Sequence, residues 1–169
     1  YVTGNLGDSF IGLNILKKKI RVNNNLKKYF ENKFYHPSLH LKFSKKLNMF
    51  ANSTIDISDG LITDLEKLIN NQNLSYKLFL DKIPISHHLK NLISSKNIKK
   101  ESCVSNGDDY QILFTARPSK TRIISNIGKT LGVKISKIGK ICSPTKDSEI
   151  LDQKGMKIKL KTKGYIHKF

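Results

Sequence analysis

The sequence feature that most constrains the fold is a change of hydrophobic periodicity within residues 54–69. Residues 54–58 alternate polar and apolar side chains, which is the pattern of a strand with one buried face. The alternation ends at Asp59-Gly60, and apolar residues then recur at the spacing of an amphipathic helix that runs to about residue 71. The apolar positions of this helix are Leu61, Ile62, Leu65, Leu68 and Ile69. The segment therefore predicts a strand, a sharp turn and a helix.

The turn between this strand and this helix collects side chains that carry oxygen. In a strand, Asp56 and Ser58 share one face, and Asp59 lies at the start of the helix. Magnesium is commonly held by one or two carboxylates together with water and phosphate, and the N-terminus of a helix favours an anion. The turn therefore fits a site for Mg²⁺ and phosphate. The same Ser-Asp-Gly sequence also fits an ordinary helix N-cap.

A second turn of similar composition lies further along the chain. Asn106-Gly107-Asp108-Asp109-Tyr110 leads directly into an apolar strand expected over residues 111–116. Two turns that combine glycine with acidic residues, each beside a strand, favour a metal site over two unrelated helix caps.

The charge of the chain is strongly basic, with 31 Lys and Arg against 13 Asp and Glu and a formal net charge of +18. Such an excess is compatible with a solvated basic surface, or with attraction to polyphosphate or nucleic acid. The lysines occur in expected loops and helices alike, together with many Ile and Asn residues, which indicates a general compositional bias. Nucleic acid is therefore a disfavoured partner. Cys103 and Cys142 have no CxxC spacing, so neither a zinc site nor a disulfide framework is expected.

The remaining patterning predicts helices and strands in alternation, in one layered α+β or α/β domain. The Asn- and Lys-rich stretch before His36 fits a helix as well as a loop. The opening residues fit the end of a strand, so we expect a truncated chain. No apolar run reaches the roughly 18 residues that span a bilayer, and a cytoplasmic protein is expected. Helices are expected over residues 9–19, 40–51, 86–95 and after Pro118-Ser119, and strands over 76–80, 134–141, 149–151 and 156–160.

Several segments resemble signatures of thiamine-monophosphate kinases, in that family's order and approximate spacing. The closing residues 164–169 resemble the family's closing glycine-aromatic-x-His-Phe segment with one extra residue, so that the resemblance runs essentially from end to end. The three internal segments are Thr3-Gly4-Asn5-Leu6-Gly7-Asp8-Ser9, Asp56-Ile57-Ser58-Asp59-Gly60-Leu61 and Gly107-Asp108-Asp109-Tyr110-Gln111-Ile112-Leu113-Phe114-Thr115.

The resemblance implies a magnesium-dependent transfer of the γ-phosphate of ATP to thiamine monophosphate, which forms thiamine diphosphate. It implies an α+β fold of the aminoimidazole-ribonucleotide synthetase-like type, layered α/β/α, with a mixed sheet covered by helices. Residues 1–169 would form the single C-terminal domain of a longer, homodimeric enzyme. Its N-terminal domain, which binds ATP and magnesium and forms the dimer, would be absent here, and the isolated chain is expected to be inactive.

The resemblance also implies roles for individual residues. Asp56 and Asp59 would be magnesium ligands, Ser58 would contact ATP, and Asp108 and Tyr165 would contact thiamine monophosphate. No catalytic nucleophile is expected, because phosphoryl transfer relies on positioning and on neutralisation of charge.

Two departures from the family's pattern affect the substrate region. Asp108 stands where the family usually has Glu, and its side chain is shorter by one methylene group, so a direct contact with substrate would become water-bridged or would need a small shift. Near His36-Pro37 the family has a stretch containing proline and arginine, which here is reduced to one proline with His40 close by.

Two alternatives stay open on sequence alone. One is another member of the same superfamily, of the selenophosphate or purine-pathway type. The other is a basic nucleic-acid-binding module, whose affinity would fall steeply with salt and would not depend on Asp56 or Asp59.

Overall fold

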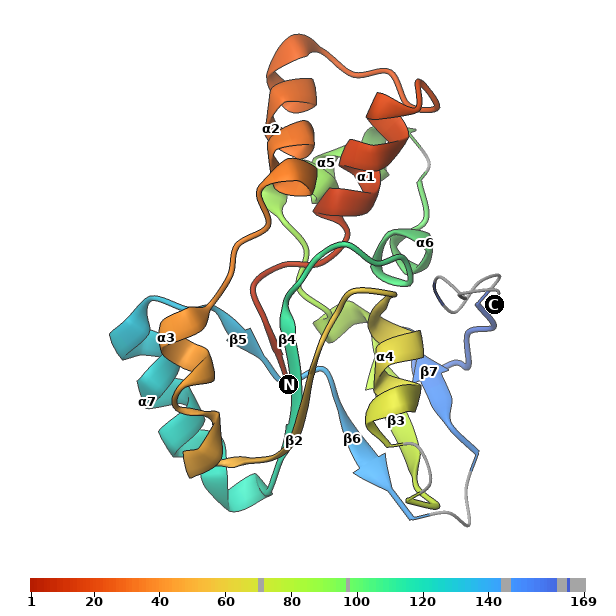
Figure 1. The fold of residues 1–169 in the computed structure, drawn as a ribbon. Helices are drawn as coiled ribbons and strands as arrows, with labels where there is room; N and C mark the ends of the chain where they lie inside the picture. Colours follow the sequence, from red (N-terminus) through yellow and green to blue (C-terminus); the bar gives the residue numbers. More distant parts are fainter. Residues whose placement is uncertain (70–71, 97, 144–146, 161–163, 165–169) are drawn as a thin grey trace, which may run out of the picture.

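Two β-sheets organise the fold, and helices lie around them (Figure 1). The computed structural model describes the chain except for residues 70–71, 97, 144–146, 161–163 and 165–169. In the described part, the first sheet has the strand order β2-β4-β1-β5 and is antiparallel throughout. Its strands are β1 (Val2–Thr3), β2 (Ala51–Asp56), β4 (Ile112–Ala116) and β5 (Ile135–Ser136).

The second sheet has β3 at its centre, antiparallel to β6 and parallel to β7. Its strands are β3 (Ser75–Phe79), β6 (Gly139–Cys142) and β7 (Glu149–Leu151). The α+β class expected from the sequence is confirmed. The strands form one antiparallel sheet and one small mixed sheet.

The split arises where one strand was expected over residues 134–141. β5 ends at Ser136 and β6 begins at Gly139, so the chain passes from one sheet to the other through Lys137 and the buried Ile138. Gly139 allows the close pairing with β3, because a Cβ atom at this position would lie 2.2 Å from the carbonyl oxygen of Lys77. The expected strand over residues 156–160 is wrong as well, because the described chain there makes only an isolated bridge between Leu151 and Lys157.

The helices form three groups around these sheets. The first group packs at one end of the molecule, α4 lies beside β3, and α3 and α7 lie side by side against the antiparallel sheet (Figure 1). The first group consists of α1 (Asp8–Leu16), α2 (Asn24–Tyr35) and α5 (His87–Lys96). The others are α3 (Leu41–Ser44), α4 (Leu61–Leu68), α6 (Lys100–Val104) and α7 (Thr121–Leu131), with short 3-10 turns η1 (Leu47–Met49), η2 (Leu80–Lys82) and η3 (Pro118–Lys120).

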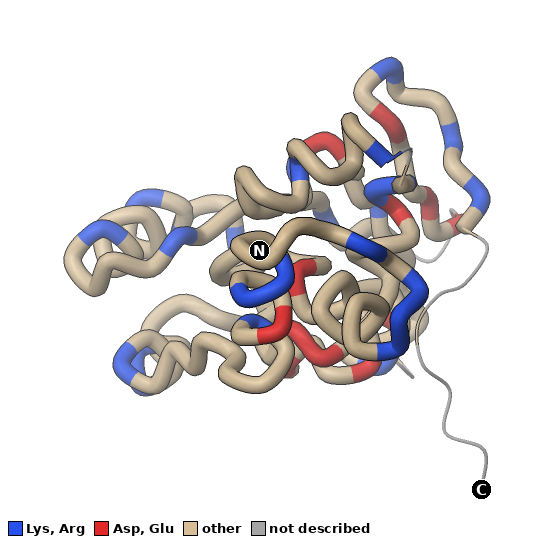
Figure 2. The backbone as a smooth tube through the Cα atoms, turned by 90° about the horizontal axis from the view of Figure 1, so that it is seen from above, with Lys and Arg blue, Asp and Glu red and all other residues tan. Residues whose placement is uncertain are grey.

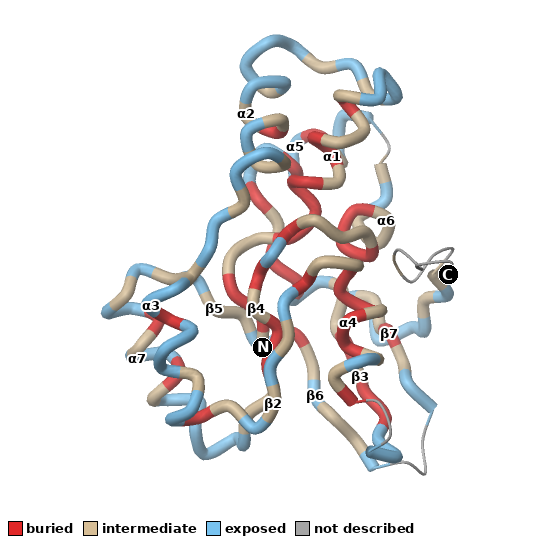
Figure 3. The backbone as a smooth tube through the Cα atoms, viewed as in Figure 1, coloured by how far each residue is buried: buried red, intermediate tan, exposed pale blue. Residues whose placement is uncertain are grey.

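Each helix group has its own apolar core, and buried residues line the inner sides of the elements (Figure 3). Phe43, Phe50 and Phe114 form one of these cores, with ring centroids 5.5 to 5.9 Å apart. Phe43 and Phe50 are both buried in this cluster, and the chain between them breaks into α3 and η1 before β2 begins at Ala51. The single helix expected over residues 40–51 is therefore wrong.

The stretch whose helical character the sequence left open is the helix α2. Its N-cap is Asn23, whose side-chain oxygen accepts a hydrogen bond from the backbone N–H of Leu26 (2.9 Å). Phe30 is the buried anchor of this helix against α1. Within the described chain, no helix is long and apolar enough to cross a membrane.

Gly12 is the contact point of α1 with α2, and we predict that replacing it by alanine destabilises the protein. A Cβ atom at this position would lie 2.3 Å from the carbonyl oxygen of Phe30. Although alanine favours helices, the overlap should lower the free energy of unfolding by about 1–3 kcal/mol. Urea denaturation measures the loss. The control Asn32→Ala changes an exposed position of α2 and should leave stability unchanged or slightly raised, and equal stability of both variants would contradict the prediction.

Candidate functional site

The two acidic turns lie side by side. Beyond the last pair of β2 and β4, which joins Asp56 to Ile112, the backbone N–H of Asp108 donates to the carbonyl oxygen of Ser58 (2.9 Å). The N–H of Tyr110 donates to the carbonyl oxygen of Ile57 (2.9 Å). The N–H of Ile57 donates to the carbonyl oxygen of Gln111 (2.8 Å). Segments far apart in sequence therefore form one continuous surface at this end of the sheet.

Two glycines make this close approach possible. A Cβ atom on Gly107 would lie 1.9 Å from the carbonyl oxygen of Ser58, and one on Gly60 would lie 2.1 Å from that of Ser105. Gly60 also has a φ of +131°, which side chains rarely adopt. Glycine at both positions is therefore required by backbone contact and not only by turn formation.

A buried carboxylate fixes the first turn. Asp64, in α4, has no exposed surface, and its Oδ2 accepts hydrogen bonds from the backbone N–H groups of Asp59 and Gly60, both at 3.0 Å. This arrangement satisfies backbone donors ahead of the helix. Sequence reasoning missed Asp64 as a structural residue, although an acidic residue one turn after a glycine N-cap is the available signal.

The carboxylate of Asp59 already has a positive partner. The Nζ atom of Lys67 contacts Oδ2 of Asp59 and lies 3.2 Å from Oδ1 of Asp64. The pKa of the Lys67 ammonium group is raised, chiefly by its hydrogen bond to Asp59. Asp59 is half-buried, whereas Asp56 is exposed at the end of β2.

The donors of this turn fit a magnesium ion that is completed by other ligands. Among the described residues, no group of three His, Cys, Asp or Glu side chains is placed to hold a metal ion. Mg²⁺ nevertheless often uses one or two carboxylates and takes its remaining ligands from water and phosphate. The binding of an ammonium group by Asp59 shows that this carboxylate accepts a cation in the folded chain. The hydroxyl-bearing Ser58 lies between the two aspartates in sequence and is half-buried.

The charge of the first turn affects the pKa of Asp108. Burial raises the pKa of its carboxyl group, the negative charge of Asp59 raises it further, and Lys17 lowers it. Asp108 and Tyr110 both have positive φ, at 67° and 50°, a conformation that costs energy in non-glycine residues and that is concentrated at functional sites. The side chain of Tyr110 is 40% exposed. The structure therefore brings Asp59 and Asp108 into electrostatic range of each other.

The neighbouring Asp109 is structural. Its buried carboxyl group accepts a hydrogen bond from the backbone N–H of Gly7 (2.8 Å) and interacts with Ser9, at the start of α1. Burial raises the pKa of Asp109 to about 8, with a further contribution from the negative charge of Asp8. The turn thus holds the helical group α1, α2 and α5 in place, a role that sequence reasoning did not identify.

Gln111 and Asp8 make further hydrogen bonds near this turn. The Oε1 atom of Gln111 accepts a hydrogen bond from Oγ1 of Thr3 (3.0 Å) and lies 2.9 Å from Nε2 of His40. Asp8 accepts hydrogen bonds from the hydroxyl groups of Ser86 (2.6 Å) and Tyr29 (2.9 Å). All three internal segments singled out in the sequence therefore meet in one hydrogen-bonded assembly.

Gly164, near the C-terminus, reaches the same place. Gly164 packs against α4 so closely that a Cβ atom on it would lie 2.3 Å from Oγ1 of Thr63 and 2.6 Å from the carbonyl oxygen of Asp59. Tyr165, which was expected to contact substrate, lies outside the described residues. Its role stays a prediction.

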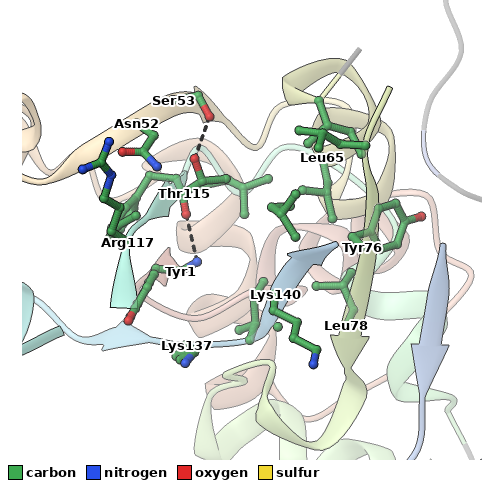
Figure 4. A pocket seen from close by; sticks show the side chains of 18 of the residues that line it. Tyr1, Asn52, Ser53, Leu65, Tyr76, Leu78, Thr115, Arg117, Lys137 and Lys140 are labelled. Atoms are coloured by element: carbon green, nitrogen blue, oxygen red, sulfur yellow. Dashed lines mark hydrogen bonds between the residues drawn. The ribbon is translucent and has the colours of Figure 1, made fainter. Parts of the chain in front are cut away.

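A cavity of about 450 Å³ lies elsewhere, between the two sheets (Figure 4). It is lined by Asn52 and Ser53 at the start of β2, by apolar side chains such as Leu65 and Leu78, and by Lys140. The hydroxyl groups of Ser53 and Thr115 are hydrogen-bonded at its edge (2.7 Å). Of the expected site residues, the four that the structure describes, Asp56, Ser58, Asp59 and Asp108, do not line this cavity. It is therefore separate from the paired acidic turns.

Comparison with known proteins gives consistent matches. No protein-family model matches the chain. Over 168 residues it is 34% identical to the thiamine-monophosphate kinase of Buchnera aphidicola subsp. Acyrthosiphon pisum, a match that covers 99% of this chain and 51% of that protein. The crystal structure of thiamine-monophosphate kinase from Stenotrophomonas maltophilia has a TM-score of 0.78 at 23% identity, and covers 93% of this chain and 50% of that one.

A second solved structure, AaThiL complexed with AMPPCP and TMP, has a TM-score of 0.76 at 24% identity and covers 98% of this chain and 50% of that one. These structural matches confirm the aminoimidazole-ribonucleotide synthetase-like fold. The chain spans about half the length of the curated relatives that it matches.

The raised pKa of Asp109 predicts a pH-dependent stability. In the folded state Asp109 keeps its proton up to about pH 8, whereas an unfolded aspartate releases its proton near pH 3.9. Stability should therefore fall as the pH rises from about 5 to about 8, because the unfolded state then binds fewer protons. Between pH 5.5 and 8.5 the unfolding free energy of both proteins should fall, but the fall should be smaller in Asp109→Asn than in the unmodified protein, by at least about 1 kcal/mol. Denaturant titrations measure this difference, and Asp147→Asn, which removes an exposed carboxyl group, is the control. Identical pH slopes for all three proteins would refute the prediction.

Proposed function

Because the chain is homologous to the thiamine-monophosphate kinases along 99% of its length and spans about half of theirs, we propose that it is the C-terminal domain of such an enzyme. The complete protein would transfer the γ-phosphate of ATP to thiamine monophosphate and so form thiamine diphosphate. The related structure that contains AMPPCP and TMP supports ATP and thiamine monophosphate as the two substrates.

The observation that carries this proposal is the junction of the two acidic turns. At the junction, the carboxylate of Asp56 is exposed and those of Asp59 and Asp108 are half-buried. The paired backbone of the two turns lies next to the first turn of α4. Phosphoryl transfer needs mainly positioning and neutralisation of charge, and these are what carboxylates and a helix N-terminus provide for a metal-bound polyphosphate.

In this proposal each residue has a distinct task. Asp56 and Asp59 hold Mg²⁺, and Ser58 contacts the nucleotide. Asp108 contacts thiamine monophosphate, and Tyr165 offers an aromatic face to its rings. Magnesium, when bound, neutralises the charge that develops on the phosphoryl oxygens. Asp64 keeps the backbone N–H groups of the turn in place, and so positions Asp59 relative to the phosphates.

The proposal extends to the context of the chain. The remaining half of such an enzyme, expected to be N-terminal, would add further magnesium and nucleotide ligands and would form a homodimer, so this domain alone would be inactive. An enzyme that consumes ATP for thiamine diphosphate biosynthesis is expected in the cytoplasm.

The basic charge does not favour a nucleic-acid-binding function. Figure 2 shows Lys and Arg on every lobe of the described chain, while several acidic residues gather near its middle. A nucleic-acid site usually concentrates positive charge on one face or along one groove. The spread of charge instead supports a general bias of composition.

We predict that Asp59→Asn lowers kcat/KM of the complete protein by about 10- to 100-fold or more, because a metal ligand is lost. Thiamine diphosphate formation from ATP, Mg²⁺ and thiamine monophosphate measures the effect, and Asp56→Asn should act in the same direction. The control Asp147→Asn removes a carboxyl group that lies outside the junction. Activity of Asp59→Asn within threefold of the unmodified protein, at unchanged melting temperature, would contradict the proposed metal site.

A further inference from the structure

Lys67 is the positive partner of the carboxylates in the first turn. Its ammonium group lies between two carboxylates, in contact with Oδ2 of Asp59 and 3.2 Å from Oδ1 of Asp64. The side chain is 49% exposed, whereas the side chains of Asp59 and Asp64 are 13% and 1% exposed. The cation therefore approaches the pair from the solvent side.

We propose that Lys67 is a built-in counter-cation of the metal site, so that Mg²⁺ binds to Asp59 by displacing the ammonium group. The inference rests on the proposed function, because it takes Asp59 to be a metal ligand. It assigns to Lys67 a role in setting metal affinity that the sequence did not indicate.

The two carboxylates have different tasks. Asp64 is held through Oδ2 by the N–H groups of Asp59 and Gly60, and cannot turn away without breaking the turn. Asp59 meets Lys67 through Oδ2, and it is the carboxylate that the proposed function assigns to the metal. In this proposal Asp59 therefore changes from ammonium to metal, while Asp64 stays with the turn.

Lys67 itself is suited to leave. Its ammonium group is a compact charge on a flexible four-carbon stem, and half of the side chain is already in solvent. Water competes for the exposed ammonium group, which weakens its hold on the carboxylates, whereas a divalent ion carries twice the charge and keeps several water ligands. Lys67 thus balances the acidic turn in the free protein and leaves when the metal ion binds.

The test measures metal binding in the complete protein without nucleotide, with Mn²⁺ as the spectroscopic probe. Electron paramagnetic resonance counts free Mn²⁺ and gives its dissociation constant. Lys67→Met keeps the apolar stem and removes the charge, and should tighten Mn²⁺ binding about fivefold. Lys67→Arg keeps the charge and should stay within twofold of the unmodified protein. Lys90→Met, which removes an exposed ammonium group from α5, is the matched control and should also have no effect.

A second readout follows the amine itself. Acetylation of Lys67 by an N-hydroxysuccinimide ester, quantified by mass spectrometry, should increase on addition of Mg²⁺, while acetylation of Lys90 should not change. Asp59→Asn should increase acetylation of Lys67 without metal. These measurements detect displacement independently of enzymatic activity.

The outcomes separate this inference from the function on which it rests. If Asp59→Asn abolishes Mn²⁺ binding but Lys67→Met leaves the dissociation constant unchanged, Lys67 is only a structural partner of the turn and the inference fails while the metal site stands. If metal does not alter acetylation of Lys67, the inference also fails. If Mn²⁺ binds with equal affinity to the unmodified protein and to Asp59→Asn, the proposed metal site and the inference fail together.

Discussion

The backbone pairing of the two acidic turns is the constraint on which the rest of the site depends. Hydrogen bonds continue the β2–β4 ladder past its last residues and join Ser58 to Asp108. The pairing is possible only because Gly107 has no side chain, since a Cβ atom there would lie 1.9 Å from a carbonyl oxygen. Without this contact, acidic residues from two distant segments would not share a surface. Backbone geometry therefore comes before side-chain chemistry in forming this site.

The acidic residues near this junction divide into two kinds. Asp64 and Asp109 are buried, and each binds backbone N–H groups at the start of a helix. Asp56, Asp59 and Asp108 retain access to solvent. In a chain with a net charge of +18, five of the thirteen acidic residues thus lie where they either fix the turns or face the proposed ligands. Burial alone distinguishes the two uses, because all five residues are aspartates.

Features that depend on local pattern could be predicted from the sequence. The strand, turn and helix around Asp59 follow from a change of periodicity and appear as β2 and α4. The partners of Asp64, Asp109 and Gln111 could not be predicted, because their side chains bind groups whose positions are set by tertiary structure. The helix expected over residues 40–51 failed for a different reason. Phe43 and Phe50, seven residues apart, would share one face of a continuous helix as well, so their spacing does not reveal the break between α3 and η1.

The presence of three separate apolar cores has a consequence for cooperativity. The core of α1, α2 and α5 is distinct from the cores beside the sheets. Asp109 connects this helical group to the junction, and Asp8 ties its helices to one another. Such a group is a natural unit of partial unfolding, with its own opening free energy. When it opens, the junction loses the backbone of Gly7 as a partner. The lifetime of a competent site would then be governed by the least stable of the three cores, and not by the global stability of the fold.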